Sequence, residues 1–268
     1  MKPLSQICEE LMVNKFFYIP KVFDKCNFLE TDEMILAKSP YHSSLFNICW
    51  IKKINPIYFE NSLRHIIEFF YPKPFALWFG MNLSTQDIEF TLNSLGFIKK
   101  NSRFNMVSDL KSITYFDKYI ENIKISKITC DLELDIFLDV IEDFEPCARG
   151  YFKKVFRELG YSNLQPYHFF YLNVANEPVC IGSIYFQNNI CGICEIFTHP
   201  NFRKKGYARK ILNFIMNYSK ENNINYLSLV ASVKFDLDLK SIAMKYKNLG
   251  FMEQGEYSCY EYEGSGFQ

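Results

Sequence analysis

Apolar residues recur along this chain with two different periods, and these periods predict its elements. One face of an α-helix returns every three or four residues, whereas one face of a strand returns every second residue. The helical period occurs near the start of the chain and in two later stretches, and each predicts an amphipathic helix. The faces comprise Leu4, Ile7, Cys8, Leu11 and Met12; Leu134, Phe137, Leu138 and Ile141; and Ala208, Ile211, Leu212 and Ile215.

Three strand-like runs follow one another in the second half of the chain. They cover residues 169–174, 179–186 and 190–197, and the turns between them lie at 176–178 and 188–189. Connections this short join neighbouring antiparallel strands. The sequence therefore predicts an antiparallel meander here.

The tripeptide Leu-Gly-Phe occurs twice, at 95–97 and 249–251. Each copy ends a helix-length segment, where a glycine can adopt the left-handed conformation that closes a helix. A strand-like run precedes each copy, at 75–79 and 226–230, and an alternating aromatic and polar stretch follows. This order predicts an α/β (α+β) architecture of two related halves, unless the repeat is chance reuse of a common helix-stop signal.

The length of 268 residues is consistent with two domains of ordinary size. The halves meet in the segment 111–122, which lacks Pro and Gly, and we expect the domains to cover residues 1–118 and 119–268. The second domain is expected to open with a strand at 123–128. The segment 146–168 predicts a helix flanked by loops.

Composition and charge exclude several classes of function. The chain has 30 basic and 30 acidic residues, which excludes the strongly basic surface of a general nucleic-acid binder, so any phosphate site must be local. The sequence has no apolar run of about 18 residues, so no membrane span is expected. Glu9 and Glu10 interrupt the segment where a signal peptide needs apolar residues. Nine cysteines without such a signal predict reduced thiols and a cytoplasmic protein.

Basic residues crowd the start of the helix predicted after residue 206. They are Arg203, Lys204, Lys205, Arg209 and Lys210. Gly206 lets backbone amides approach a ligand closely, and the unpaired N–H groups at a helix N-terminus favour an anion. The segment therefore predicts a pyrophosphate cradle, with a solvated basic helix start as the alternative. The glycine signatures of P-loop and dinucleotide-binding folds are absent from the sequence.

The pattern Arg-x-x-Gly-x-Ala, formed by Arg203, Gly206 and Ala208, resembles the acetyl-coenzyme A loop of the Gcn5-related N-acetyltransferase (GNAT) family. Tyr246 lies five residues before Phe251, at the position of a tyrosine that recurs in that family. The resemblance covers residues 120–268. It implies a tandem arrangement in which the first half is a degenerate GNAT-like domain, and each domain is a mixed, mostly antiparallel sheet flanked by helices.

The resemblance also implies a reaction. An acetyl group would pass from acetyl-CoA to a primary amine by direct attack in a ternary complex, without a metal. Glu195 is the candidate base and Tyr246 the candidate acid that protonates the leaving thiolate. The alternatives are an outward-facing or salt-bridged Glu195 and a core aromatic at Tyr246. The residues expected to contact the cofactor are Ile196, Phe197, Thr198, Arg203, Lys204, Lys205, Gly206, Tyr207, Ala208, Arg209 and Ser241.

This sequence departs from the family pattern at two places. Many members have an Asn early in the last helix, whereas this chain has Asp238 followed by Leu and Lys, which leaves Ser241 as the substitute. In the first half, an alignment of Asn55-Pro56 with His199-Pro200 places none of the loop's motif residues at the matching positions. Leu92 takes the place of Tyr246. The residues opposite the loop are then Phe59, Glu60, Asn61, Ser62 and Arg64. We expect this half to shape the acceptor cleft or to be structural, and not to turn over acetyl-CoA.

The cysteines, the histidines and the aromatic run near the end of the sequence give weaker indications of function. Cys191 and Cys194 form a C-x-x-C pair, but their odd separation in a strand points them to opposite faces, so metal or redox chemistry is not expected. His199 is expected to be a turn residue, and His168 is a weaker candidate for an acceptor-site base. The run 257–262 either lines the acceptor cleft or belongs to the core. The sequence leaves open whether the acceptor is a small molecule or a protein, and a non-catalytic acyl-CoA-binding sensor is the alternative function.

Overall fold

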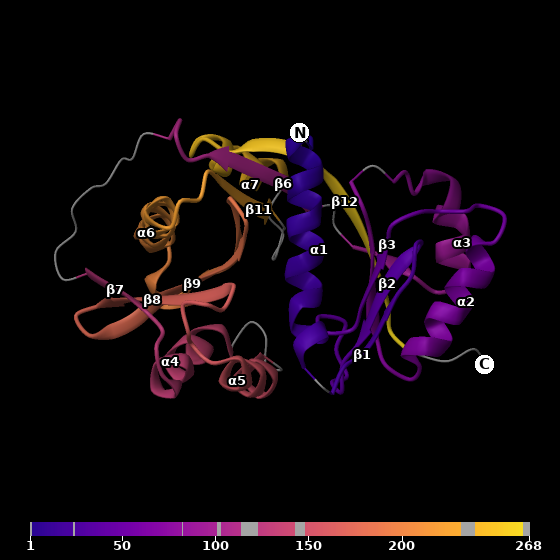
Figure 1. The fold of residues 1–268 in the computed structure, drawn as a ribbon, viewed down its shortest axis with the longest axis horizontal. Helices are drawn as coiled ribbons and strands as arrows, with labels where there is room; N and C mark the ends of the chain where they lie inside the picture. Colours follow the sequence, from indigo (N-terminus) through magenta and orange to yellow (C-terminus); the bar gives the residue numbers. More distant parts are fainter. Residues whose placement is uncertain are drawn as a thin grey trace. The chain divides into compact units, whose positions relative to one another are not determined.

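The computed structural model describes residues 2–23, 25–81, 83–100, 103–113, 123–142, 148–231 and 239–264. The chain forms two compact units, and each is built from segments that are not consecutive in the sequence (Figure 1). Unit 1 comprises residues 1–106, 231–245 and 253–268, and unit 2 comprises residues 107–230 and 246–252. The boundary predicted between residues 118 and 119 lies outside the described residues and stays a prediction.

Unit 1 is built on a mixed sheet with the strand order β1-β2-β3-β4-β12, and β5 also pairs with β12. The β3–β4 pair is parallel and the other pairs are antiparallel. Figure 1 shows α1 on one side of β1–β3 and the helices α2 and α3 on the other. The elements are α1 (Leu4–Val22), β1 (Asn27–Glu30), β2 (Met34–Lys38), β3 (Ile48–Ile51), α2 (Phe59–Phe70), β4 (Phe75–Phe79), the 3-10 turn η1 (Gln86–Ile88), α3 (Glu89–Ser94), β5 (Ile98–Lys99) and β12 (Met252–Tyr262).

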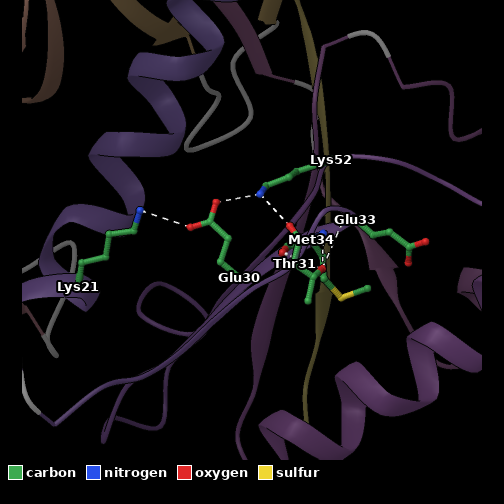
Figure 2. Close-up of polar contacts among 6 residues, drawn as sticks. All are labelled: Lys21, Glu30, Thr31, Glu33, Met34 and Lys52. Carbon is green, nitrogen blue, oxygen red and sulfur yellow. Dashed lines mark hydrogen bonds and ion pairs between the residues drawn. The ribbon is translucent and has the colours of Figure 1, made fainter.

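The helix predicted near the start of the chain is α1, and Cys8, Leu11 and Met12 are buried as its pattern predicts. An ion-pair network joins the end of this helix to the strands (Figure 2). Lys52 Nζ donates to Glu30 Oε1 at 2.8 Å and to the carbonyl oxygen of Thr31 at 2.9 Å, and Lys21 approaches the other carboxylate oxygen at 3.6 Å. The hydrogen bond from Lys52 is the main reason that the pKa of Glu30 lies below its usual value. Thr31 Oγ1 also accepts the N–H groups of Glu33 and Met34, which closes the turn into β2.

The strand β12 brings the far end of the chain into unit 1. It runs antiparallel to β4, from Ser258 opposite Phe79 to Tyr262 opposite Phe75. The Tyr260 ring packs edge-on against Phe79 at 5.8 Å, and the Tyr262 ring lies 5.5 Å from that of Phe75. The core alternative for the run 257–262 is therefore confirmed. The alternating stretch that follows Phe251 forms a single strand, β12.

Unit 2 contains the predicted meander. Its strand order is β11-β10-β9-β8-β7, in which only the β10–β11 pair is parallel. Figure 1 shows α6 on one side of β8 and β9 and α4 and α5 on the other. The elements are β7 (Ile123–Lys127), α4 (Asp131–Glu142), α5 (Ala148–Leu159), β8 (Tyr167–Val174), β9 (Glu177–Gln187), β10 (Ile190–Thr198), η2 (Pro200–Phe202), α6 (Tyr207–Glu221) and β11 (Tyr226–Ala231). The strand β6 (Arg103–Asp109) and the helix α7 (Leu239–Lys247) contribute residues to both units.

The helical faces predicted for unit 2 are buried with one exception. Ile211, Leu212 and Ile215 of α6 are buried, but Ala208 is exposed. This part of the prediction is wrong because α6 begins at Tyr207, whose side chain takes the inward position in the first turn. The face of α4 is confirmed, with Leu134, Phe137, Leu138 and Ile141 all buried.

The two Leu-Gly-Phe copies have the same geometry. Gly96 and Gly250 have φ values of 86° and 87°. The N–H of Phe97 donates to the carbonyl oxygen of Leu92 at 3.0 Å, and the N–H of Phe251 donates to that of Tyr246 at 3.1 Å. Both helices therefore end in the same glycine cap. A mixed α/β fold is confirmed, and none of the described helices combines the length and hydrophobicity that a bilayer crossing requires.

Candidate functional site

The strand β10 separates from its parallel neighbour part way along its length. Residues 190–192 pair with residues 226–228 of β11, although β10 continues to Thr198 and β11 to Ala231. Pairing of β10 with β9 continues to Thr198, opposite Cys180. Residues 193–198 therefore keep β9 on one edge, and their other edge is not covered by β11.

Backbone groups of β10 point toward this open edge. The N–H of His199 donates to the carbonyl oxygen of Val179 in β9 at 2.9 Å. Backbone groups of an antiparallel ladder alternate in direction, so those of Ile196 and Thr198 point away from β9. The contact from Arg203 Nε to the carbonyl oxygen of Thr198, at 3.2 Å, agrees with this direction. The open edge can thus bond an extended, amide-containing ligand.

The loop after β10 leads into a helix N-terminus that no side chain caps. His199 Nδ1 accepts the N–H of Asn201 at 3.4 Å, so the prediction of a turn residue there is confirmed. Lys204 and Gly206 both have left-handed backbone conformations, with φ values of 62° and 86°. The first turn of α6 has no acidic residue. Its N–H groups lack intrahelical acceptors and are suited to an anion.

Space and charge at this N-terminus also suit an anionic ligand. A Cβ atom at Gly206 would meet nothing within 4 Å. Lys205 Nζ lies 5.2 Å from the centre of the Phe202 ring, which holds this cation beside the loop. The basic residues Arg203, Lys204, Lys205 and Arg209 are exposed. Backbone donors, open space and positive charge together fit a diphosphate.

A β-bulge sets the direction of Glu195. Ile193 lies opposite Ile184 of β9, whereas Glu195 lies opposite Ser183, so Cys194 is an extra residue in the ladder. In a regular strand residues 193 and 195 would share a face, but the extra residue places them on opposite faces.

The face that Glu195 shares with Ser183 is the one covered by α4 and α5. A Cβ atom at Gly182 would lie 3.1 Å from Ile215 and 3.2 Å from Ile211, so residue 182 faces α6 and residue 183 faces the other way. The hydroxyl of Ser183 donates to Glu195 Oε2, and Ser183 is fully buried while Glu195 is partly exposed. The carboxylate is therefore held on the α4–α5 face of the sheet.

Tyr246 lies in the last turn of α7, directly before the second glycine cap. Its ring packs edge-on against that of Phe251, with centroids 5.9 Å apart. Burial raises the pKa of this phenol, so it is protonated at neutral pH. Ser241 lies in the same helix, but its side chain is outside the described part of the chain, as is all of Asp238. The contact predicted for Ser241 stays a prediction.

His168 lies on the wrong face of the sheet to act beside Glu195. It is opposite Ile184 in the register of β8 and β9, on the face covered by α6. Its side chain is buried, with Nδ1 2.9 Å from the hydroxyl of Tyr218. Burial is the main cause that lowers its pKa to about 4. The hypothesis of an acceptor-site base at His168 is wrong.

The C-x-x-C pair spans the bulge. Cys191 is buried, which raises the pKa of its thiol to about 12, and Cys194 is the extra residue itself. Side chains do not alternate strictly between the two faces of a sheet at a bulge. The odd separation of Cys191 and Cys194 therefore does not by itself place their thiols on opposite faces, as the sequence predicted. Among the described residues, no group of three or more His, Cys, Asp and Glu side chains could hold a metal ion.

The corresponding segment of unit 1 has a different geometry. The strand β3 pairs with β4 along its whole length, from Ile48 opposite Ala76 to Ile51 opposite Phe79. Its loop, residues 52–58, has no glycine. The alignment of Phe59 with a loop residue is wrong, because Phe59 is the buried first residue of α2.

The first turn of α2 also differs in charge from that of α6. It contains Glu60, which pairs with Arg64 at 2.8 Å, whereas the first turn of α6 has no acidic residue. A carboxylate at this position would repel a diphosphate. The described segment from β3 to α2 therefore has neither the open strand edge nor the glycine-containing loop of unit 2.

Sequence reasoning missed the contact between Ser183 and Glu195. The sequence signal was a serine inside the otherwise apolar run Val-Cys-Ile-Gly-Ser-Ile-Tyr-Phe of residues 179–186. A buried hydroxyl needs a partner, which points to a polar neighbour on the adjacent strand. The identity of that neighbour depends on the bulge at Cys194, and no residue of the sequence signals a bulge there.

Comparison with known proteins identifies one matching family model and several similar folds. Residues 137–251 match the model of the acetyltransferase (GNAT) family. The fold is similar to a GCN5-related N-acetyltransferase from Kribbella flavida, with a TM-score of 0.72, 8% identity and coverage of 97% of this chain and 96% of that chain.

Two further solved structures have similar folds. A functionally unknown conserved protein from Staphylococcus epidermidis has a TM-score of 0.66 and 16% identity over 92% of this chain and 97% of that chain. A tandem GNAT protein from the clavulanic acid biosynthesis pathway has a TM-score of 0.57 and 11% identity, over 88% and 79% of the two chains. No curated protein matches this sequence significantly.

Proposed function

We propose that this chain, whose residues 137–251 match the GNAT acetyltransferase family model, transfers an acetyl group from acetyl-CoA to a primary amine. The observation that carries this proposal is the open edge of β10 beyond Gly192, which leads directly to the uncapped N-terminus of α6. An extended arm that ends in a diphosphate has both kinds of partner there, in the order that acetyl-CoA requires.

The binding of acetyl-CoA is assigned to backbone groups more than to side chains. The amides of Ile196 and Thr198 face the open edge and are suited to the pantetheine arm. The loop from Arg203 to Gly206 and the first turn of α6, which contains Tyr207, hold the pyrophosphate. The exposed basic side chains add counter-charge for the phosphates. Phe197 lies between Ile196 and Thr198, and its backbone N–H and C=O groups point the other way, toward β9.

The chemistry follows from three groups of this chain. Acetyl-CoA supplies the acetyl thioester, and the amine nitrogen forms a bond to the carbonyl carbon as the carbon–sulfur bond breaks. Glu195 accepts the proton that the amine loses, and the neutral phenol of Tyr246, whose pKa burial raises, donates a proton to the departing sulfur. A β10 amide at Ile196 stabilises the developing oxyanion.

The first half is proposed to be a degenerate GNAT-like domain. Its parallel pair β3–β4 is joined by α2, as β10–β11 is joined by α6, and both halves have the same glycine cap. The tandem arrangement of a protein with a similar fold supports this proposal. The paired β3 and the carboxylate of Glu60 support the proposal that this half does not turn over acetyl-CoA.

The test measures release of free thiol from acetyl-CoA across a panel of polyamines, amino acids, aminoglycosides and peptides. Tyr246→Phe should lower kcat about tenfold or more and leave the Kd of coenzyme A within about twofold, because only the proton donor is lost. Tyr226→Phe removes a phenol hydroxyl from β11 and serves as the matched control. No thiol release with any amine, together with tight binding of coenzyme A, would instead favour an acyl-CoA-binding sensor.

A further inference from the structure

We propose that Ser183 is the positioning residue for Glu195, so that β9 orients the base of the transfer reaction. The inference rests on the proposed function and extends it to a residue that does not touch either substrate. Ser183 Oγ donates to Glu195 Oε2, and the two residues lie directly opposite each other in the β9–β10 register.

The contact depends on the bulge at Cys194. Without the extra residue, Glu195 would share a face with Ile193 and its carboxylate would lie under α6. With the extra residue, the side chain of Glu195 lies on the α4–α5 face, next to Ser183, which is its partner in the β9–β10 register. The bulge therefore determines the face on which Glu195 lies, and the hydrogen bond from Ser183 holds its carboxylate there.

Burial makes this contact specific. Ser183 is fully buried, so its hydroxyl has no access to water and needs a protein acceptor. Glu195 Oε2 accepts the hydrogen bond from Ser183, and the carboxylate stays partly exposed, so an amine can approach it. A hydrogen bond to the charged form also favours the ionised carboxylate, which is the form a base requires.

Several other titratable groups described on this face are engaged with one another. Tyr171 of β8 donates to Glu133 of α4 at 3.1 Å, and the Tyr167 ring of β8 packs on that of Tyr185 of β9 at 4.9 Å. Charged residues of α4 and α5 form ion pairs between the helices, Arg157 with Asp131 at 2.8 Å and Lys153 with Asp135 at 2.7 Å. The hydrogen bond from Ser183 joins the side-chain carboxylate of Glu195 to β9.

The first experiment needs no acceptor. The protein is labelled at the side-chain carboxyl carbon of Glu, the Glu195 signal is assigned by its loss in Glu195→Gln, and its titration is followed by NMR. Ser183→Ala should raise the pH midpoint of this signal by about one unit, because a donor to the charged form is removed. Ser183→Thr keeps the hydroxyl and should restore the midpoint. Ser219→Ala, which removes a buried hydroxyl from α6, is the matched control and should not move it.

The second experiment measures rates with an amine that the panel identifies. Ser183→Ala should lower kcat about tenfold, move the acid limb of the pH profile upward and leave the Kd of coenzyme A unchanged. In the Glu195→Gln background the same substitution should change kcat less than about twofold, because its effect passes through the carboxylate.

The outcomes separate this inference from the proposed function. An unmoved Glu195 midpoint in Ser183→Ala, or an equal loss of kcat in both backgrounds, overturns the positioning role and leaves the transferase proposal standing. Full activity of Glu195→Gln overturns the proposed base, even if the midpoint still shifts.

Discussion

The substitution Gly206→Glu tests the phosphate cradle most directly. Gly206 has a φ of 86°, so any other residue carries a backbone cost of about 1–2 kcal/mol. A side chain there meets open space, since a Cβ atom would have no neighbour within 4 Å, and the fold should tolerate the change. The added carboxylate would lie where the diphosphate is expected.

The expected loss of affinity follows from Coulomb's law. Two like unit charges about 4 Å apart repel by about 1 kcal/mol in water and by about 4 kcal/mol at the effective dielectric constant near a protein surface. The Kd of coenzyme A should therefore weaken by about fivefold to a thousandfold, with the larger loss at low salt. Isothermal titration calorimetry at two salt concentrations measures both effects.

Two control variants separate charge from strain. Gly206→Ala carries the same backbone cost without the charge and should bind coenzyme A far more tightly than Gly206→Glu. Gly160→Glu adds a carboxylate at another left-handed glycine that faces open space, with φ of 74°, after α5. Equal affinity of Gly206→Glu and Gly160→Glu for coenzyme A would refute the assignment of the cradle to the start of α6.

Two further predictions concern stoichiometry and pH. Calorimetry should find about one coenzyme A bound per chain, because β3 stays paired with β4 and α2 begins with an acidic turn; a value near two contradicts this. His168 should make the protein sensitive to acid. Its pKa falls from the ordinary 6.5 to about 4 on folding, so between these values the unfolded chain binds a proton that the folded chain does not. The free energy of unfolding should decrease by about 3 kcal/mol as the pH falls through this window. Urea unfolding at pH 7 and pH 4.5 measures the difference, which should shrink in His168→Gln; an unchanged difference would exclude His168 as its source.

Local pattern predicted the elements of unit 2 well. The alternation of residues 169–197 and the turns at Asn176 and Asn188 define the meander, because both the period and the short connections are encoded locally. The face of α6 followed from its period except at Ala208. There the helix start at Tyr207 decided which side chain points inward, and a periodic pattern does not fix its own first residue.

Features that depend on pairing between distant segments could not be predicted. The face occupied by Glu195 reverses at a bulge of one residue, Cys194, whose position depends on the register with β9. The choice of β4 as the partner of β12 joins residues nearly 180 positions apart, from Phe79 to Ser258, and no local pattern encodes it. The motif at Arg203, Gly206 and Ala208 predicted a loop that the structure places at an uncapped helix N-terminus, whereas the roles of Glu195 and Tyr246 stay predictions.

The strand β12 has a consequence for synthesis on the ribosome. The edge of β4 receives its antiparallel partner only when residues 258–262 have been made, so the sheet of unit 1 stays incomplete while all of unit 2 is translated. During that interval Phe75 and Phe79 lack the tyrosine rings that pack against them in the finished fold, and an unpaired strand edge of this kind is prone to aggregate. The sheet of unit 1 is therefore the last part of the fold to be completed, although most of its strands are made first. A ribosome that stalls before residue 258 would release a first half whose sheet lacks β12.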